Sequence, residues 1–166
     1  MTRILGIDTS LHSTGYAVIE SAGGRMMALA SGAISSPTRA THSAILHNLH
    51  SAIDELIGRT APDEAAIEGI FFAKNVKTSV ALGEARGAVL IACAQRHLPV
   101  YEYPPRKVKQ AVVGNGAAEK FQVRKMVTAM LGLTDDPQED AGDAMAIAIC
   151  HLHQRSAYAV LQPKAI

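Results

Sequence analysis

RILGID, at residues 3–8, is the stretch of sequence that decides the fold. Its short apolar run, bounded by Arg3 and Asp8, is typical of a buried strand. TGYAVIE at 14–20 predicts a second strand, and RMMALASGAIS at 25–35 predicts a third that returns after a turn at 21–24. The chain is therefore expected to begin with strands joined by a tight hairpin.

The remainder of the chain alternates between helical and strand patterns. Apolar residues within 41–58 recur at the spacing of an amphipathic helix, while 64–70 and 100–103 are predicted strands. Further helices are predicted over 78–97, from 104 to about 113, over 117–131 and over 139–154, and the last is apolar enough to be packed on both sides. This order predicts one α/β domain over 1–166, with a mixed five-stranded sheet flanked by helices and a short tail after about 155.

Composition sets the broad class of the protein. The chain has 166 residues, is 48% hydrophobic and 19% charged, and carries a formal net charge of +1, as ordinary globular proteins do. We expect a cytoplasmic protein, because no apolar run reaches the length of a membrane span and the first apolar run is interrupted at Asp8. Cys93 and Cys150 lie in apolar helical stretches and are predicted to be buried and reduced.

Two carboxylates stand at unusual places in predicted strands. Asp8 ends the first apolar strand, and Glu68 interrupts the strand at 64–70. Burying a carboxylate in a sheet is costly in free energy unless the group is paired or bound to a metal. Each also has a simpler interpretation: Asp8 would cap a turn through the amides of Thr9 or Ser10, and Glu68 would face solvent.

A second acidic feature opens the last predicted helix. Asp140 and Asp143 are spaced i, i+3 and therefore share one face. Acidic residues in a first helical turn also complement the helix dipole, which is their simpler explanation. Taken together, carboxylates from the first strand, a central strand and the last helix can meet at one edge of the sheet. Such an all-oxygen cluster suits Mg²⁺ or Mn²⁺ and favours phosphodiester hydrolysis with two ions.

Basic residues gather in one part of the chain. Residues 106–125 hold six basic side chains and a single acid, Glu119, in a protein that is otherwise nearly neutral. A charge run of this kind is often only the solvated face of a helix. Placed beside the acidic cluster, it would bind phosphates with an affinity that depends on salt.

Several blocks, in order, resemble the RuvC family of Holliday junction resolvases, within the ribonuclease H-like superfamily. The resemblance extends from Ile4 to about His153 and rests on blocks that individually are weak but together are specific. It implies a ribonuclease H-like fold. The blocks are ILGIDTS, TGYAVIE, AIEGIFFAKN, LGEARG, VYEYPPRKVKQAVVGNGAAEK and PQEDAGDAMAIAICH.

The resemblance implies roles for individual residues. Asp8, Glu68, Asp140 and Asp143 match the family's catalytic and metal-binding carboxylates, which implies two Mg²⁺ ions per subunit, replaceable by Mn²⁺, and nicks that leave 5′-phosphate and 3′-hydroxyl ends. Phe71 matches a phenylalanine that stacks on a base near the crossover, an interaction typically worth about 1–3 kcal/mol. The other residues expected to contact DNA are Lys74, Arg86, Arg106, Lys109, Lys120 and Arg124.

Partners follow from the same resemblance. The substrate would be a four-way DNA junction, cut at two opposed points by a homodimer, with a branch-migration complex of the RuvA and RuvB type alongside it. The predicted helix at 78–97 has the small residues that allow two helices to approach closely, although it must also pack on its own sheet. These residues are Ala81, Gly83, Ala85, Gly87 and Ala88.

Three other functions would use parts of the same pattern. An ATP-binding fold of the actin and sugar-kinase type shares the first strand and hairpin, but it needs two such halves, and this chain lacks a Walker-type glycine loop. A non-catalytic junction-binding relative would be expected to have lost one of the four carboxylates. A ribonuclease H-like nuclease acting on RNA would use the same acids, but the block PPRKVKQAVVGNGAAEK at 104–120 is not a general feature of that superfamily.

Overall fold

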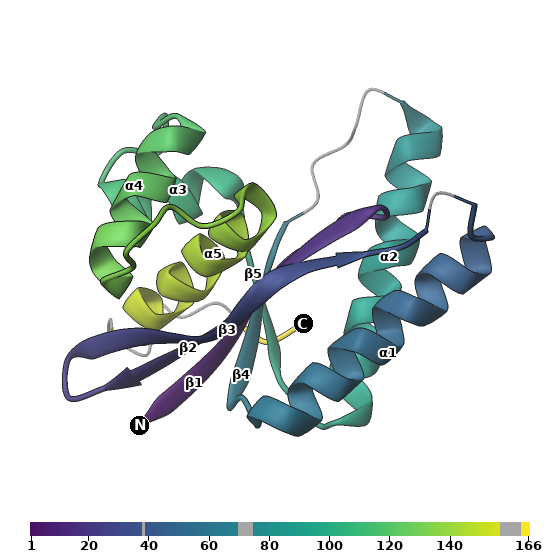
Figure 1. The fold of residues 1–166 in the computed structure, drawn as a ribbon, viewed down its shortest axis with the longest axis horizontal. Coiled ribbons are helices and arrows are strands. Elements are labelled where there is room, and N and C mark those ends of the chain that lie inside the picture. Colours follow the sequence, from purple (N-terminus) through teal and green to yellow (C-terminus); the bar gives the residue numbers. More distant parts are fainter. Residues whose placement is uncertain (38, 70–74, 157–163) are drawn as a thin grey trace.

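The computed structural model describes residues 1–37, 39–69, 75–156 and 164–166, and within these ranges five strands form one mixed sheet. Their order across the sheet is β3-β2-β1-β4-β5 (Figure 1). The first three strands run antiparallel, and β4 and β5 continue the sheet parallel to β1. The strands are β1 (Thr2–Asp8), β2 (Ser13–Ala22), β3 (Arg25–Ser35), β4 (Glu64–Glu68) and β5 (Val100–Tyr103).

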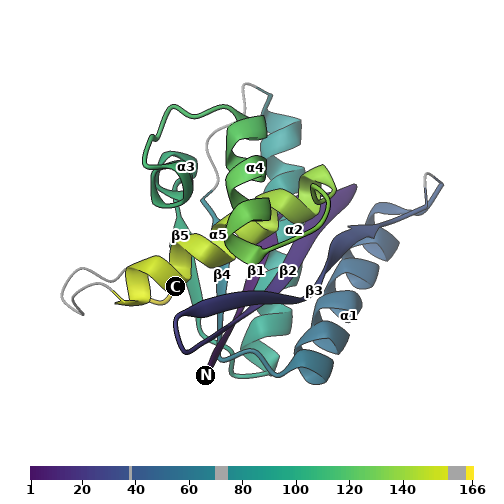
Figure 2. The same cartoon turned by 60° about the vertical axis from the view of Figure 1, so that its left-hand side comes forward.

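Helices cover both faces of the sheet. Figures 1 and 2 show α1 (His42–Thr60) and α2 (Val76–Gln95) on one face. The other face carries α5 (Glu139–Ser156), with α3 (Pro105–Val113) and α4 (Lys120–Leu131) packed over it. The mixed α/β sheet expected from the sequence is confirmed, as is the packing of α5 on two sides.

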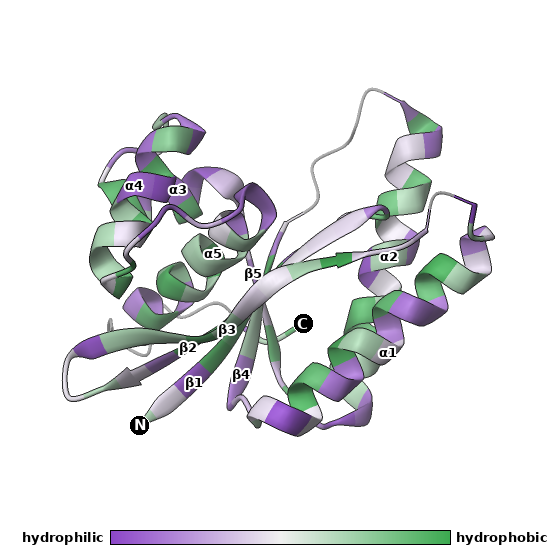
Figure 3. Ribbon diagram, in the orientation of Figure 1, coloured by the Kyte–Doolittle hydropathy of each residue, from purple (hydrophilic) through white to green (hydrophobic). Residues whose placement is uncertain are grey.

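Alternation along the strands assigns side chains to the two faces. In β1, Leu5 and Ile7 pack with α1 and α2, whereas Ile4 packs with α5. Successive side chains of a strand point to opposite faces, so Gly6 and Asp8 share the α5 face with Ile4. On α1, the predicted apolar positions are all buried, and Figure 3 shows green and purple bands alternating along this helix. They are Ile45, Leu49, Ile53, Leu56 and Ile57.

Helix α5 packs on the sheet at very close range. A Cβ atom at Gly6 would overlap the carbonyl oxygen of Ala144, and one at Gly15 would overlap that of Asp140. Only glycine leaves room for a helix backbone at these two points. The two glycines therefore set how near the first turns of α5 come to β1 and β2.

The other end of α5 is held by buried hydrogen bonds. His151 is 3% exposed, and its Nε2 lies 2.6 Å from the Glu64 carboxylate while its Nδ1 lies 2.6 Å from the Tyr103 hydroxyl. Because a carboxylate only accepts, Nε2–H donates to Glu64, and Nδ1 accepts the tyrosine proton. Burial lowers the pKa of His151, which favours this neutral form. The network joins α5 to β4 and β5.

Some element boundaries differ from the sequence prediction. The helix predicted over 117–131 begins instead at Lys120, because Glu119 caps it: the Glu119 amide donates to the side chain of Gln122. The helix predicted from 78 begins at Val76, where the side chain of Asn75 accepts from the Lys77 amide. Strand β4 ends at Glu68 rather than at residue 70.

The two cysteines agree with the sequence prediction. Cys93 and Cys150 are both buried and free. In the part of the chain that the structure describes, no helix combines the length and the apolar character needed to cross a membrane.

The close approach of α5 predicts that Gly6→Ala is strongly destabilising. Because the added methyl meets helix backbone, which cannot move aside as a flexible side chain can, we expect a loss of about 2–4 kcal/mol in the free energy of unfolding. The matched control is Gly58→Ala in α1, where a Cβ makes only ordinary contact with Arg96 and should give a small gain. Urea denaturation measures both, and equal stability of the two variants would contradict the prediction.

Candidate active site

Asp8 and Glu68 lie side by side at the ends of neighbouring parallel strands. The register of β1 and β4 pairs Ile7 with Ile67, so the next residue of each strand is the carboxylate. Both are even-numbered in strands whose even positions face α5, since Ile4 and Ala66 pack with that helix. Asp8, predicted at a strand end, and Glu68, predicted within a strand, therefore share one edge and one face of the sheet.

Helix α5 brings the other two acids to the same edge. Asp8 is paired in register with Gly15 of β2, and the backbone of Asp140 rests directly over that glycine. Asp143 follows one turn later on the same helix face. The first turn of α5 is thus fixed above the end of β1, which is where the sequence predicted the four carboxylates to meet.

A cavity of about 230 Å³ opens among these residues. Its charged lining consists of three of the four predicted acids and two predicted lysines, and α3, α4 and α5 supply its apolar wall. Asp140 does not line it; the Asp140 carboxylate accepts a hydrogen bond from the Ser13 hydroxyl. The charged residues lining the cavity are Asp8, Glu68, Asp143, Lys109 and Lys120.

The strand carboxylates are difficult to ionise in this position. Burial, and next the charge of Asp143, raise the pKa of Asp8 to about 6. Burial, and next the charge of Asp8, raise the pKa of Glu68 to about 7. Lys120 opposes both shifts. Desolvation and mutual repulsion of this kind are relieved when a cation binds between the carboxylates.

A lysine supplies positive charge to the acids of α5. Lys120 Nζ lies 2.9 Å from the Asp143 carboxylate and 3.0 Å from that of Glu139. The hydrogen bond to Asp143, and next the one to Glu139, raise the pKa of Lys120 above its ordinary value. Among the described side chains, Asp8 and Glu68 have no hydrogen-bond or ion-pair partner of this kind.

The donor set fits a hard divalent cation. The candidate ligands are all carboxylate oxygens, without the imidazole or thiolate that zinc favours, and such sets suit Mg²⁺ or Mn²⁺. Within residues 1–37, 39–69, 75–156 and 164–166, no three His, Cys, Asp or Glu side chains are gathered closely enough to hold an ion as they stand. Of the two α5 carboxylates, that of Asp143 is bonded to Lys120 and that of Asp140 to Ser13.

The predicted DNA-contacting residues fall into different places. Lys109 and Lys120 line the carboxylate cavity, and Arg124 lies against Gly142 near the start of α5. Arg106 packs on Gly116, in the loop before α4. Phe71 and Lys74 lie outside the described residues.

Arg86 is placed behind the site. Its guanidinium donates to the backbone carbonyl of Glu68 at 3.1 Å and forms an ion pair with Glu102. It reaches β4 and β5 from α2, which covers the face opposite to α5, and its side chain is only 13% exposed. In this arrangement Arg86 holds the end of β4; contact with DNA stays a prediction.

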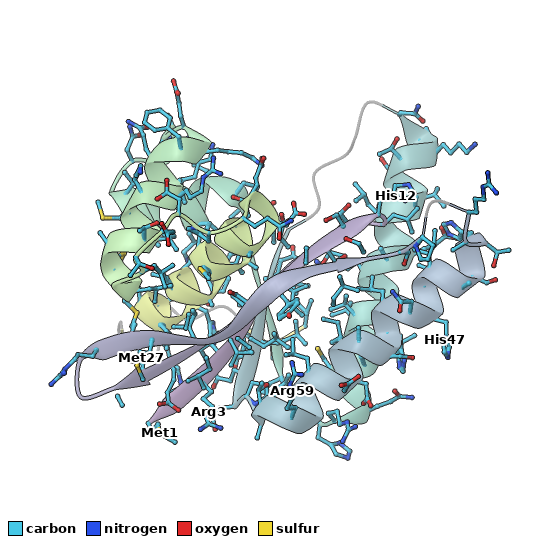
Figure 4. The ribbon with its side chains drawn as sticks, in the orientation of Figure 1. Met1, Arg3, His12, Met27, His47 and Arg59 are labelled. Carbon is cyan, nitrogen blue, oxygen red and sulfur yellow. The ribbon has the colours of Figure 1, made fainter. Side chains whose placement is uncertain are left out.

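His12, the histidine nearest to Asp8 in sequence, does not line the carboxylate cavity. It borders a separate cavity with Ser10, His42 and the first turns of α2 (Figure 4). Figure 4 also shows that Met1 and Arg3 lie at the opposite end of β1 from His12. We therefore assign His12 no part in the carboxylate cluster.

Sequence reasoning missed two residues at the site, Ser13 and Glu139. Ser13 donates to Asp140 across 127 positions of sequence, and Glu139 shares Lys120 with Asp143. Glu139 has a local signal, since it directly precedes Asp140 in the same acidic turn. Ser13 has only a weak one, namely its place two residues before Gly15 on the same strand face.

Comparison with known proteins gives consistent matches over nearly the whole chain. The family model described as crossover junction endodeoxyribonuclease RuvC matches residues 4–151. A RuvC crossover junction endodeoxyribonuclease from Idiomarina loihiensis is 48% identical over 157 residues, covering 92% of this chain and 88% of the relative. One from Alkalilimnicola ehrlichii is 44% identical over 162 residues, covering 98% of each chain.

Solved structures agree with these relatives. Thermus thermophilus RuvC in complex with a Holliday junction substrate superposes with a TM-score of 0.93 at 29% identity, over the full length of both chains. The yeast mitochondrial Holliday junction resolvase Ydc2 has a TM-score of 0.67 at 13% identity, over 92% of this chain and 78% of that one, which is a likeness of fold alone. The expected ribonuclease H-like fold class is confirmed. On this sequence and structural similarity, the chain belongs to the RuvC family of crossover junction endodeoxyribonucleases.

Proposed function

We propose that this chain cuts Holliday junctions at a metal centre held by Asp8, Glu68, Asp140 and Asp143. Its class of activity, phosphodiester hydrolysis in crossover junctions, follows from its family. The observation that carries the residue assignment is the cavity in which strand and helix carboxylates meet two lysines. We further propose that residues 1–166 act as one domain in the cytoplasm, on four-way junctions delivered by a branch-migration complex of the RuvA and RuvB type.

The carboxylates and lysines divide the work of the site. Two Mg²⁺ ions, replaceable by Mn²⁺, would supply the Lewis acidity that activates water and stabilises the leaving oxygen. Asp8 and Glu68 fix the position of this charge because they end rigid neighbouring strands. Lys109 and Lys120 line the same cavity and bind the phosphate, and a lysine there stabilises negative charge as it develops.

Hydrolysis forms one bond at phosphorus and breaks another. The oxygen of a water molecule bonds to phosphorus, and the bond from phosphorus to the 3′ oxygen breaks. The 3′ oxygen takes up a proton and leaves as a hydroxyl, while the phosphate stays on the 5′ end. We propose that further residues contact the DNA outside this centre and that one of them, Phe71, stacks on an unpaired base. These residues are Arg124, Arg106, Arg86, Lys74 and Phe71.

A homodimer would give the two opposed cuts that a junction with near two-fold symmetry requires. We propose α2 as a contact between copies, because its outer side carries apolar and small residues at helical spacing. Val80 and Ile91 are each 55% exposed, and a Cβ at Gly83 or Gly87 would meet no atom within 4 Å. Ala85, by contrast, is buried against the chain's own core.

Asp8→Asn tests the metal centre. We expect the variant to bind synthetic four-way junctions with nearly the affinity of the parent and to lose cleavage by at least about 100-fold, as enzymes do when a catalytic group is removed. Labelled junctions with Mg²⁺ report cutting, and gel shifts in Ca²⁺ or EDTA report binding. Cleavage by Asp8→Asn at the parent rate would exclude Asp8 from the centre.

The same substitution should stabilise the metal-free protein at alkaline pH. The folded pKa of Asp8, about 6, lies above its ordinary value of 3.8, so the parent loses stability as pH rises from about 4 through 6. The asparagine side chain of the variant does not titrate, and its advantage should grow over that window to roughly 1–3 kcal/mol above pH 7. Urea denaturation in EDTA at pH 4 and pH 8 measures it.

The control for this measurement is Asp54→Asn. Its ion pair with Arg96 lowers the pKa of Asp54, so the sign of the effect is opposite and no gain at pH 8 is expected. Addition of Mg²⁺ should then raise the melting temperature of the parent more than that of Asp8→Asn. A pH-independent difference between the parent and Asp8→Asn would contradict the raised pKa.

Ile91→Glu tests the dimer. A charge placed in the proposed contact should give a monomer in sedimentation at micromolar concentration, and paired nicks should give way to junctions cut once. Met27→Glu is the matched control, since Met27 is 58% exposed on β3, away from α2 (Figure 4). If Ile91→Glu remains a dimer that cuts in pairs, α2 is not the contact.

A further inference from the structure

Asp140 is held by a side chain from a distant part of the sequence. Ser13 Oγ donates a hydrogen bond to Asp140 Oδ2. Ser13 begins β2, whereas Asp140 lies in the first turn of α5. This hydrogen bond is a direct contact between Ser13, a polar residue outside the predicted site, and one of the four predicted acids of that site.

The backbone around Ser13 is fixed independently of this bond. Ser13 is in register with Ser35 of β3. The next residue, Thr14, is 1% exposed, and its hydroxyl accepts from the Ser10 amide at 3.1 Å and donates to the Ser10 carbonyl. Strand pairing on one side and this closed turn on the other leave the Ser13 hydroxyl at a defined place.

Gly15 then brings Asp140 to that hydroxyl. Residues 13 and 15 face the same side of β2, and the backbone of Asp140 fits against Gly15 because no Cβ is present there. With its backbone fixed over Gly15, the Asp140 carboxylate reaches Ser13, two residues earlier on the same face. The pair Ser13 and Gly15 therefore holds both the main chain and the side chain of Asp140.

Ser13 differs from the other partner found at the acids of α5. Lys120 carries a positive charge, its side chain is 63% exposed, and its charge competes with a cation for Asp143. The Ser13 hydroxyl is neutral and does not repel a cation. It donates to Oδ2 only, which leaves Oδ1 of Asp140 for a ligand.

We propose that Ser13 is a positioning residue that orients the Asp140 carboxylate for a divalent cation. The inference rests on the proposed metal centre and deepens it. Hydrogen bonds to the ligands of a metal typically contribute about 10–100-fold to its affinity, because they keep the ligand oriented before the metal arrives. Ser13 thus limits the orientations open to the Asp140 carboxylate, whereas the Asp143 carboxylate is bonded to Lys120.

The test measures metal binding itself. We expect Ser13→Ala to bind Mg²⁺ or Mn²⁺ about 10-fold more weakly in calorimetry, at the low end of that range. Ser13→Thr, which keeps the hydroxyl, should restore most of the affinity. Ser35→Ala, in register with Ser13 on the neighbouring strand, is the matched control and should bind as the parent does.

Cleavage gives a second readout. In Ser13→Ala the Mg²⁺ concentration for half-maximal cutting should rise about 10-fold, while the rate at saturating Mg²⁺ should recover most of the parent value. Ser13→Ala added to Asp140→Asn should cause little further loss of metal affinity, since the residue it orients is already changed.

Several results would overturn the inference. Unchanged metal affinity in Ser13→Ala, or tighter binding, would mean that the hydroxyl does not prepare Asp140. Failure of Ser13→Thr to restore affinity would exclude the hydroxyl as the active group. If the parent protein bound neither Mg²⁺ nor Mn²⁺, the proposed metal centre itself would fail, which is distinguishable from a parent that binds metal and a Ser13→Ala that binds it equally well.

Discussion

The contact on which the rest of the structure depends is the approach of helix α5 to strands β1 and β2. Gly6 and Gly15 leave space for the carbonyl oxygens of Ala144 and Asp140, and no other residue type would fit at either point. This contact sets the height of α5 above the sheet. Because Gly15 is paired with Asp8, the same contact sets the distance between the acids of the helix and those of the strands.

The site that results stores unfavourable electrostatic energy. Burial and like charge raise the pKa values of Asp8 and Glu68. In the metal-free protein the charged forms of these two carboxylates are therefore less stable than they would be in water. The fold tolerates this because apolar side chains pack on both faces of the sheet. The buried bonds of His151 to Tyr103 and Glu64 also hold the far end of α5, so repulsion at its start cannot easily move the helix.

Much of this arrangement was predictable from local patterns. Short apolar runs predicted strands, and the spacing in 41–58 predicted the buried face of α1. The predicted start of α4 at residue 117 is three residues too early, because the helix begins where Glu119 and Gln122 satisfy its first amide groups. For Arg86, which the sequence predicts to contact DNA, only the structure shows that α2 carries it to the other face of the sheet, where it donates to the Glu68 carbonyl.

The sequence by itself determined which residue types stand at strand ends and helix starts, and its ordered blocks determined the family. Those features are local, since a strand period or a helical turn depends on neighbours a few positions away. Only the tertiary structure decided that Ser13 donates to Asp140, that Lys120 forms an ion pair with Asp143, and that His12 borders a different cavity. Such pairs depend on how closely one element packs on another, and that distance is set by contacts between residues far apart in the chain.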